Sequence, residues 1–527
     1  MMQIYKIDGS DVEIISCPPE DVRKGDYLII EDVSTDKGLI IQVVNTGYAN
    51  VPGILEDILR ESSASGIEGK DFDVLNMRPF VDMIKDAKVF SCKIRRALVK
   101  GELSYDISWT PFRSSSRVGR LADEELLKIA AIDQTPSIHI GTSKGGAATA
   151  INLSSIDGKL NIITGKKGSG KSHLSKLLVL NLVAHGGPCV VFDINGEYTS
   201  LGYTEDDVKT SINDAIINIY PGVNFKITLQ YAGLGVLLNI ASSVLDLPAT
   251  SAWEVRRIWN TLQENKNLSL KSFGEAVDRI SNNYVRDAVL RRFESLVSTG
   301  LFTDNNSEAV TLEDYLTKVK NGGALIINLK GLPSSFRQVI VEFMLSKLCS
   351  MLDQWFMRAV FLFAEEAHLY LKETYWEDIV TRMRHLGIFT TFITNQPDSI
   401  NESIYRQADN IFLFNFTNEN DLATVSKATM VDVETINTIA KELPPQYCLA
   451  LGRAVNDFPL IIKVRSLQIK TLGQTRLFFS NLSIQDKNER SQSRRESHSP
   501  DSLVPSKNLP SIQDGNRNKI KDRQLRI

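Results

Sequence analysis

A glycine-rich stretch that ends in a lysine and a serine is the part of this sequence best suited to chemistry. It reads G-x-x-x-x-G-K-S from Gly165 to Ser172. Glycines allow backbone N–H groups to surround phosphate oxygens, and the helical pattern that follows adds the positive end of a helix dipole. Lys171 would reach the β- and γ-phosphates of ATP, and the Ser172 hydroxyl would ligate Mg²⁺. We expect these residues to bind the nucleotide: Gly165, Lys166, Lys167, Gly168, Ser169, Gly170, Lys171, Ser172 and His173.

Two adjacent glutamates follow an apolar run later in the chain. Residues 359–364 predict a buried strand that leads directly into Glu365 and Glu366. In this Walker B arrangement Glu365 would hold the Mg²⁺, and Glu366 would orient or deprotonate the attacking water. A carboxylate pair at the end of a buried strand is costly to leave unpaired, so a metal or ligand is its natural partner. A strand-to-helix cap is the structural alternative.

Other polar residues past predicted strands complete the candidate site. Asp193 and Glu197 follow a buried strand, where a doubly wound sheet forms its ligand crevice, although a turn cap explains each of them equally well. Gln396, with Asn395 as the alternative, follows the strand after the acidic pair and would contact the γ-phosphate unless it is only a polar turn. Arg384 would act as an arginine finger on a neighbouring subunit's γ-phosphate, or is an exposed arginine at a helix end.

The elements that must position these side chains alternate between apolar strands and helical patterns over residues 159–466. This alternation predicts an α/β fold with a P-loop, RecA-like core. A mostly helical, polar stretch at about 205–318 is too long to be a plain crossover, so we expect a helical insertion there. Residues 121–158 read as a connector that precedes the core.

The two ends of the chain differ from this core. Residues 1–120 contain short β-branched runs bounded by turn residues, which predict a small N-terminal β-barrel interrupted by a helical excursion at about 51–63. Residues 467–527 are polar and lack periodicity, so we expect a disordered tail. Its mildly basic composition is compatible with nucleic acid, but a solvated tail is the simpler interpretation.

Composition limits the possible partners. The 527 residues carry a net charge of −3, so any contact with nucleic acid must come from local patches or from a pore lined by several copies. The five cysteines form no CxxC pair, which argues against a zinc site and a disulfide framework and fits a reducing compartment. No apolar run approaches the roughly 20 residues that span a bilayer. We expect a cytoplasmic protein without a membrane partner.

Taken together in this order, the motifs resemble the HerA-like hexameric DNA translocases of the HerA/FtsK group of P-loop ATPases. The resemblance covers about residues 1–466 and includes the predicted barrel. Its motifs are Ile138-His-Ile-Gly141, Gly165 to Ser172, Phe192-Asp-Ile-Asn-Gly-Glu-Tyr198, Glu365-Glu-Ala-His368, Arg384-His-Leu-Gly387 and Asn395-Gln-Pro-Asp-Ser-Ile400. Two features depart from the family pattern: Lys166-Lys167, where small residues are common, and the polar tail.

The resemblance implies a homo-hexameric ring with ATP at the subunit interfaces and double-stranded DNA threaded through a central pore. It also implies a partner, either a nuclease of the NurA type in DNA-end processing or an effector in phage defence. The leading hypothesis is therefore an ATP-driven DNA translocase or helicase. A regulatory ATP-binding ring that scaffolds an effector and a protein-translocation ATPase are the alternatives.

Overall fold

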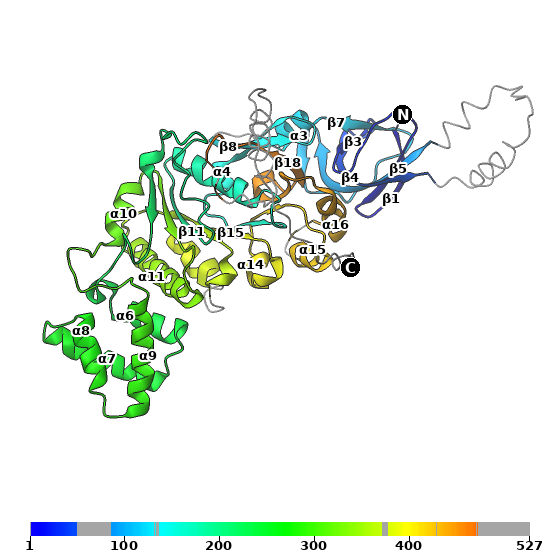
Figure 1. The fold of residues 1–527 in the computed structure, drawn as a ribbon. Coiled ribbons are helices and arrows are strands. Elements are labelled where there is room, and N and C mark those ends of the chain that lie inside the picture. Colours follow the sequence, from blue (N-terminus) through cyan, green and yellow to red (C-terminus); the bar gives the residue numbers. More distant parts are fainter. Residues whose placement is uncertain are drawn as a thin grey trace, which may run out of the picture. The chain divides into compact units, whose positions relative to one another are not determined.

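The computed structural model describes residues 2–49, 86–130, 132, 136–371, 378–427, 429, 431–470 and 472. The helical excursion expected at about 51–63 lies outside the described residues, as does the tail beyond residue 472. The chain divides into two units, and every element named below belongs to the first, Met1–Gly473 (Figure 1). Over the described ranges, no helix has both the length and the apolar character needed to cross a membrane.

The N-terminal domain is a closed β-barrel, as the short β-branched runs predict. Its strands follow the order β2-β1-β7-β3-β4-β5, β5 pairs back with β2 to close the ring, and β6 pairs with β5 only. Side chains alternate between the two faces, so β2 buries Val12 and Ile14 on one side. The strands are β1 (Met2–Asp8), β2 (Asp11–Ser16), β3 (Tyr27–Asp32), β4 (Lys37–Tyr48), β5 (Lys88–Val99), β6 (Glu102–Ser104) and β7 (Ser116–Leu121).

The core is an 11-stranded sheet with the order β12-β13-β11-β14-β15-β10-β16-β17-β18-β8-β9. The strands from β12 to β16 in this order are parallel, and those from β17 onward are antiparallel. The parallel part confirms the predicted α/β core. The strands are β8 (Ser137–Ser143), β9 (Ala148–Asn152), β10 (Asn161–Thr164), β11 (Pro188–Asp193), β12 (Ile216–Ile219), β13 (Gly323–Asn328), β14 (Val360–Glu365), β15 (Ile388–Thr394), β16 (Asn410–Leu413), β17 (Tyr447–Gly452) and β18 (Leu460–Val464).

Both faces of the parallel sheet are covered by helices, which explains why its strands read as continuous apolar runs. Ile163 of β10 belongs to the apolar cluster that includes helix α4 (Lys171–Ala184). Its neighbour Ile162 belongs to the cluster that includes helix α11 (Ser334–Asp353), on the other face. The sheet is therefore doubly wound, and its carboxyl edge brings the ends of β10, β11, β14 and β15 together.

Two segments that the sequence analysis did not assign to the sheet are part of it. The β8–β9 hairpin, expected within the connector 121–158, pairs with β18 and extends the antiparallel end of the sheet. Strand β12, expected within the insertion, pairs with β13 at the opposite end. The smaller helices of the described chain are α3 (Asp123–Ile129), α13 (Arg384–Leu386), α14 (Glu402–Arg406), α15 (Glu419–Ser426) and α16 (Val433–Glu442).

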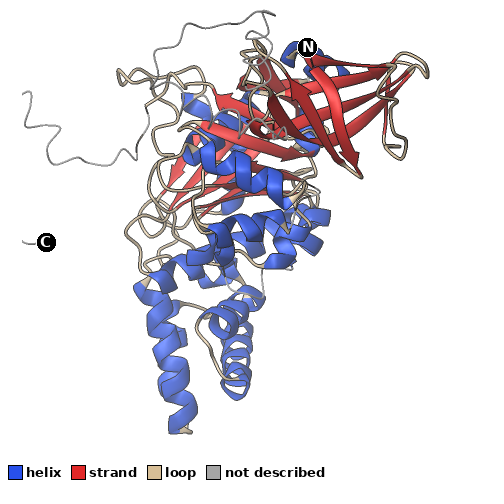
Figure 2. Ribbon diagram, turned by 90° about the vertical axis from the view of Figure 1, so that its right-hand side faces the viewer, coloured by secondary structure: helices blue, strands red, loops and turns tan. Residues whose placement is uncertain are grey.

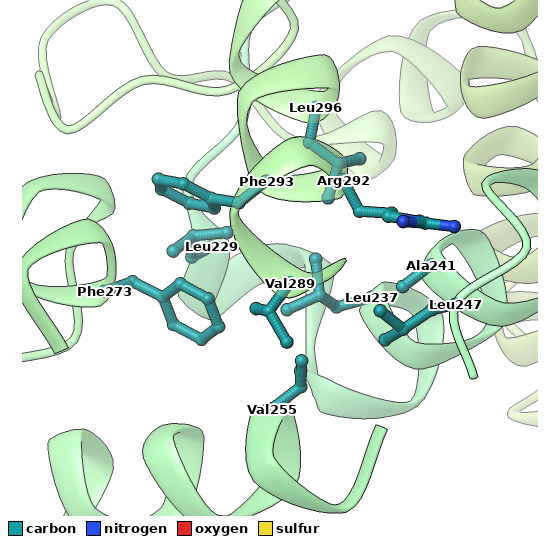
Figure 3. A pocket seen from close by; sticks show the side chains of 10 residues that line it. All are labelled: Leu229, Leu237, Ala241, Leu247, Val255, Phe273, Val289, Arg292, Phe293 and Leu296. Carbon is teal, nitrogen blue, oxygen red and sulfur yellow. The ribbon is translucent and has the colours of Figure 1, made fainter. Parts of the chain in front are cut away.

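The insertion itself is helical and has its own apolar centre. Figure 2 distinguishes its helices from the strands of the core, and Figure 3 shows Val255, Phe273 and Val289 pointing toward one another between them. These side chains line a cavity of about 20 Å³, which is too small for a ligand. The helices are α5 (Leu229–Ala232), α6 (Leu234–Asn239), α7 (Ala249–Glu264), α8 (Leu270–Asp278), α9 (Asn283–Ser298) and α10 (Leu312–Val319).

Candidate active site

The glycine-rich loop connects β10 to α4 at the carboxyl edge of the sheet. Gly165, Gly168 and Gly170 have φ angles of 155°, 78° and 121°, which side chains larger than hydrogen rarely tolerate. A Cβ atom on Gly165 would lie 2.4 Å from Cβ of Phe414, which follows β16. The loop therefore packs closely against the neighbouring strand, and glycine is required at this position for that reason as well as for its φ angle.

Two backbone hydrogen bonds fix the loop, and its two non-consensus lysines are exposed. The backbone N–H of Lys166 donates to the Asn415 carbonyl at 3.0 Å, and the backbone N–H of Gln446 donates to the Ser169 carbonyl at 2.9 Å. Lys166 and Lys167 are exposed. The open side of the loop thus carries two extra positive charges, which favours anionic phosphate.

Lys171 is buried at the start of α4, with 7% of its surface exposed. Its ammonium donates to the carbonyls of Gly165 at 2.7 Å and Lys166 at 3.0 Å. Burial lowers the pKa of Lys171, and the charges of Glu366, Glu365 and Glu197 oppose that shift. The ammonium therefore lies among the loop carbonyls and near the carboxylates, where phosphate oxygens would be its natural additional partners.

Ser172 and Glu365 meet at this edge, as the metal assignment requires. The Ser172 hydroxyl donates to Oε1 of Glu365 at 3.4 Å. Oε2 of Glu365 is buried and has no hydrogen-bond partner among the described residues. Burial raises the pKa of Glu365 to about 8, and the charges of Glu197, Asp193 and Glu366 add to the rise.

This hydroxyl and carboxylate fit Mg²⁺, because both are oxygen ligands and the second carboxylate oxygen lacks a partner. Within the described ranges, no group of three or more His, Cys, Asp or Glu side chains could hold a metal without other ligands. A site with one hydroxyl and one carboxylate suits Mg²⁺ beside a nucleotide, where water and phosphate oxygens supply the remaining ligands. Ser172 and Glu365 would therefore hold the ion together with the nucleotide.

Glu366 has a left-handed backbone, with φ 46° and ψ 49°, which is uncommon for a residue with a side chain. Its N–H donates to the Ile393 carbonyl at 2.7 Å, which holds the turn against β15. Its Oε2 accepts from the Thr394 hydroxyl at 3.2 Å and from the Asn395 N–H at 3.3 Å. Oriented backbone strain of this kind is frequent at active sites, and here it aims the carboxylate at the turn after β15.

The turn after β15 contributes through its backbone. β15 lies between β14 and β10, so its end lies between the acidic pair and the glycine loop. Of the two candidate amides, Asn395 contacts Glu366 with its main chain. Gln396 is exposed, and its N–H donates to the Thr394 hydroxyl at 3.0 Å. The Gln396 side chain is thus available to a ligand, while Asn395 and Thr394 position Glu366.

Asp193 and Glu197 have different environments. Both Asp193 oxygens accept backbone N–H groups at 2.9 Å, from Glu197 and Tyr198, so this carboxylate caps the turn after β11. Burial raises the pKa of Asp193. Glu197 forms an ion pair with Lys176 of α4 at 3.6 Å. The turn-cap interpretation therefore accounts for the contacts of Asp193, whereas Glu197 lies near enough to Glu365 to influence its charge.

The side chains of two expected site residues bond to groups other than the acidic pair. The His173 ring contacts the Arg465 carbonyl at 2.8 Å. Arg384 forms an ion pair with Asp409 at 2.9 Å and donates to the Gly158 carbonyl at 3.0 Å. Gly158 precedes β10, whereas the glycine loop follows it, so Arg384 lies at the opposite edge of the sheet from its own chain's loop.

Several residues of the site were not singled out from the sequence. Thr394, Phe414 and Lys176 support Glu366, the glycine loop and Glu197, respectively. The sequence offers two signals for these residues: Thr394 ends an apolar strand, and Lys176 lies within an apolar helix. Neither signal identifies its partner, because both partners come from distant parts of the chain.

Comparison with known proteins gives a consistent family. The family described as "Helicase HerA, central domain" matches residues 138–348. The DNA double-strand break repair helicase HerA of Sulfolobus acidocaldarius is 24% identical over 490 residues, covering 86% of this chain and 90% of that protein. The HerA of Sulfurisphaera tokodaii is 24% identical over 486 residues, with the same shares covered. These matches confirm the resemblance inferred from the motifs.

Two solved structures also align with this chain. The plasmid coupling protein TrwB in complex with ADP and Mg²⁺ is 13% identical, with a TM-score of 0.48, covering 67% of this chain and 94% of that chain. VirB4 of Thermoanaerobacter pseudethanolicus is 14% identical, with a TM-score of 0.49, covering 64% of this chain and 98% of that chain.

Proposed function

We propose that this HerA-like P-loop ATPase hydrolyses Mg·ATP in order to move double-stranded DNA. The observation that carries the proposal is the contact between Ser172 and Glu365 at the carboxyl edge of the sheet, with Lys171 and Glu366 beside it. A phosphate loop, a metal-holding carboxylate and a second carboxylate are the parts that water-driven phosphoryl transfer requires. The two relatives reported above, named for DNA double-strand break repair, support DNA as the substrate.

Each residue of the site has a defined task in this proposal. The loop N–H groups and Lys171 bind the β- and γ-phosphates, and Gln396 contacts the γ-phosphate. A bound Mg²⁺, held by Ser172 and Glu365, would neutralise charge on these phosphates. Glu366 orients the attacking water and accepts its proton, because Thr394 and Asn395 fix its carboxylate in the turn after β14.

The proposed assembly is a homo-hexameric ring with ATP between subunits. The position of Arg384 supports it, because Arg384 lies at the opposite edge of the sheet from its own glycine loop. Only a neighbouring copy could therefore place a triphosphate beside Arg384. Charge developing on that phosphate would be stabilised by the guanidinium.

An ATPase assay with and without linear duplex DNA, paired with a mass measurement of the assembly, tests the proposal. We expect a ring-sized mass and an ATPase rate that rises several-fold with DNA at low salt. DNA binding should weaken steeply as salt is added, since phosphate contacts release counterions. ATP hydrolysis that ignores DNA, in a protein that does not bind it, would contradict DNA movement and favour a scaffolding ring or a protein-translocation ATPase.

We also propose that the ring works in the cytoplasm with a second protein, either a NurA-type nuclease or a defence effector. A motor that moves DNA alters no covalent bond in it, so processing of DNA ends needs a separate activity. Co-expression with a candidate nuclease, followed by size-exclusion chromatography, tests this pairing. Separate elution at micromolar concentrations would exclude that nuclease.

A further inference from the structure

Lys176 is a buried lysine that none of the assigned roles uses. It lies in α4, and 3% of its surface is exposed. Its ammonium lies 3.6 Å from Oε2 of Glu197, 5.5 Å from the centre of the Tyr198 ring, and 3.2 Å from the Leu472 carbonyl, to which it donates. A buried ammonium is costly unless it is paired and hydrogen-bonded, and all three contacts offset that cost.

One face of α4 carries three polar residues at helical spacing. Ser172, Ser175 and Lys176 lie on adjacent turns, at positions i, i+3 and i+4. Ser172 contacts Glu365, the Ser175 hydroxyl shares a hydrogen bond with the Tyr198 hydroxyl, and Lys176 pairs with Glu197. The same helix face that receives the nucleotide therefore also holds the turn after β11.

The anion that Lys176 pairs with belongs to a group of four carboxylates. The charges of Glu197, Asp193 and Glu366 all act on Glu365. Asp193 is fixed by two backbone N–H groups, and Glu366 by Thr394 and Asn395. Among the described residues, Lys176 is the cation that forms an ion pair with Glu197. The position of the Glu197 carboxylate near Glu365 therefore depends on Lys176.

The segment after β18 lies beside this pair. The Lys470 N–H donates to the Tyr203 carbonyl at 2.8 Å, and the Ser200 hydroxyl donates to the Lys470 carbonyl at 2.7 Å. These bonds hold the segment along the turn that follows β11, and Leu472 then reaches Lys176. A buried ion pair is less screened than an exposed one and holds a fixed geometry.

We propose that Lys176 is a positioning residue for ATP hydrolysis, which fixes the Glu197 carboxylate beside Glu365 and acts through it. The inference rests on the proposed ATPase mechanism. It requires that losing Lys176 and losing Glu197 have the same effect, since either change removes the same ordered pair. Among the described residues, Lys176 forms its ion pair, hydrogen bond and ring contact outside the glycine loop, so nucleotide binding should change little.

A double-mutant cycle on the full-length protein tests this, with Lys176→Gln, Glu197→Gln and the combined variant. We expect each single change to lower kcat about 10-fold or more, because small displacements at a reacting centre are costly. The dissociation constant of Mg·ADP, measured by calorimetry, should stay within about 3-fold of the unmodified protein, since the loop contacts remain. The combined variant should lose no more than the worse single one.

A matched control is available in α11. Lys347 is a partly buried lysine that lies 4.2 Å from the centre of the Tyr231 ring and donates to a backbone carbonyl, but it lies outside the proposed site. Lys347→Gln should therefore lower the melting temperature while kcat stays within about 2-fold, because both lysines contact a tyrosine ring and donate to a backbone carbonyl. A loss of kcat at Lys176 that Lys347→Gln reproduces would overturn the positioning role.

The combined amide variant keeps the test decisive if a single change prevents folding, because it leaves no buried charge unpaired. An unmodified rate in this variant would overturn the inference, as would losses that multiply across the cycle. Absence of ATP hydrolysis in the unmodified protein would instead remove the proposed function itself.

Discussion

The Ser172 hydroxyl lies 3.4 Å from Oε1 of Glu365, so residues 193 positions apart in the sequence meet at one edge of the sheet. The carboxylate is buried, and its other oxygen has no partner among the described residues. This arrangement is unfavourable for the free carboxylate and favourable for a bound cation. The free energy of unfolding of the nucleotide-free protein should therefore depend on whether Glu365 is protonated.

Glu365 gives the nucleotide-free protein a defined pH dependence. Burial raises the pKa of Glu365 from 4.5 to about 8, so between these values the native state binds more protons than the unfolded state. Protonated Glu365 therefore contributes fully to the free energy of unfolding below pH 4.5. This contribution is lost as pH rises through 8, at up to about 1.4 kcal/mol per pH unit. Urea unfolding at pH 6 and pH 8.5 measures it, and Glu365→Gln should flatten the dependence. Equal slopes in both proteins would contradict this assignment.

The sequence predicted the strands and motifs of this site because their signals are local. An apolar run that ends in Glu365 and Glu366, or a glycine loop between a strand and a helix, can be identified from adjacent residues alone. The roles of Thr394 and Asn395 could not be identified in this way, because they depend on the order of strands in the sheet. The sequence predicted a γ-phosphate contact from the Gln396 amide, with Asn395 as the alternative, and gave no sign that the backbone N–H of Asn395 contacts Glu366.

Long-range contacts account for the other differences. The β8–β9 hairpin reads as a connector, because its pairing partner β18 lies more than 300 residues later. Lys176 donates to the carbonyl of Leu472, a residue within a stretch that composition alone describes as a polar tail. Composition gives the average polarity of a segment. It does not identify the individual residues of that segment that make tertiary contacts.

Lys171→Ala should abolish nucleotide binding. The Lys171 ammonium is buried in the glycine loop, bonded to the Gly165 and Lys166 carbonyls, and alanine would leave those groups and the phosphates without their cation. We expect the affinity for Mg·ADP to fall at least about 100-fold, as measured by calorimetry, because a buried charge-assisted contact is lost. Lys159→Ala, a lysine before β10, serves as the control. Retained binding in Lys171→Ala would remove the site assignment.

Glu366→Gln should bind ATP but hydrolyse it slowly. Glutamine keeps the shape of the side chain and can accept from Thr394 and Asn395, but it cannot take a proton from water. We expect kcat to fall about 100- to 10,000-fold with nucleotide affinity nearly unchanged, a range typical of a lost general base. Single-turnover hydrolysis and equilibrium binding measure the two effects separately. Normal turnover would exclude Glu366 as the base. Glu402→Gln, at an exposed position of helix α14, controls for a general loss of acidic charge.

Arg384→Ala should lower ATP hydrolysis through the neighbouring subunit. Arg384 lies at the opposite edge of the sheet from its own glycine loop, and a strand of about 3.3 Å per residue separates Gly158 from that loop. We expect a loss of at least about 100-fold, because trans arginines contribute strongly to phosphoryl transfer. Mixing Arg384→Ala with Lys171→Ala subunits should partly restore the rate, since some interfaces then pair an intact loop with an intact arginine.

The ion pair with Asp409 provides the control for this last prediction. If Arg384 only braces the sheet edge, Asp409→Asn should reproduce the loss, because it removes the same 2.9 Å contact. If Arg384 reaches a neighbour's phosphate, Asp409→Asn should cost far less, since the guanidinium keeps its charge and its bond to the Gly158 carbonyl. Arg382→Ala, two residues earlier, controls for the helix end, where an ion pair with Asp378 is exposed. Equal losses in Arg384→Ala and Asp409→Asn, without restoration on mixing, would place Arg384 in a structural role in its own subunit.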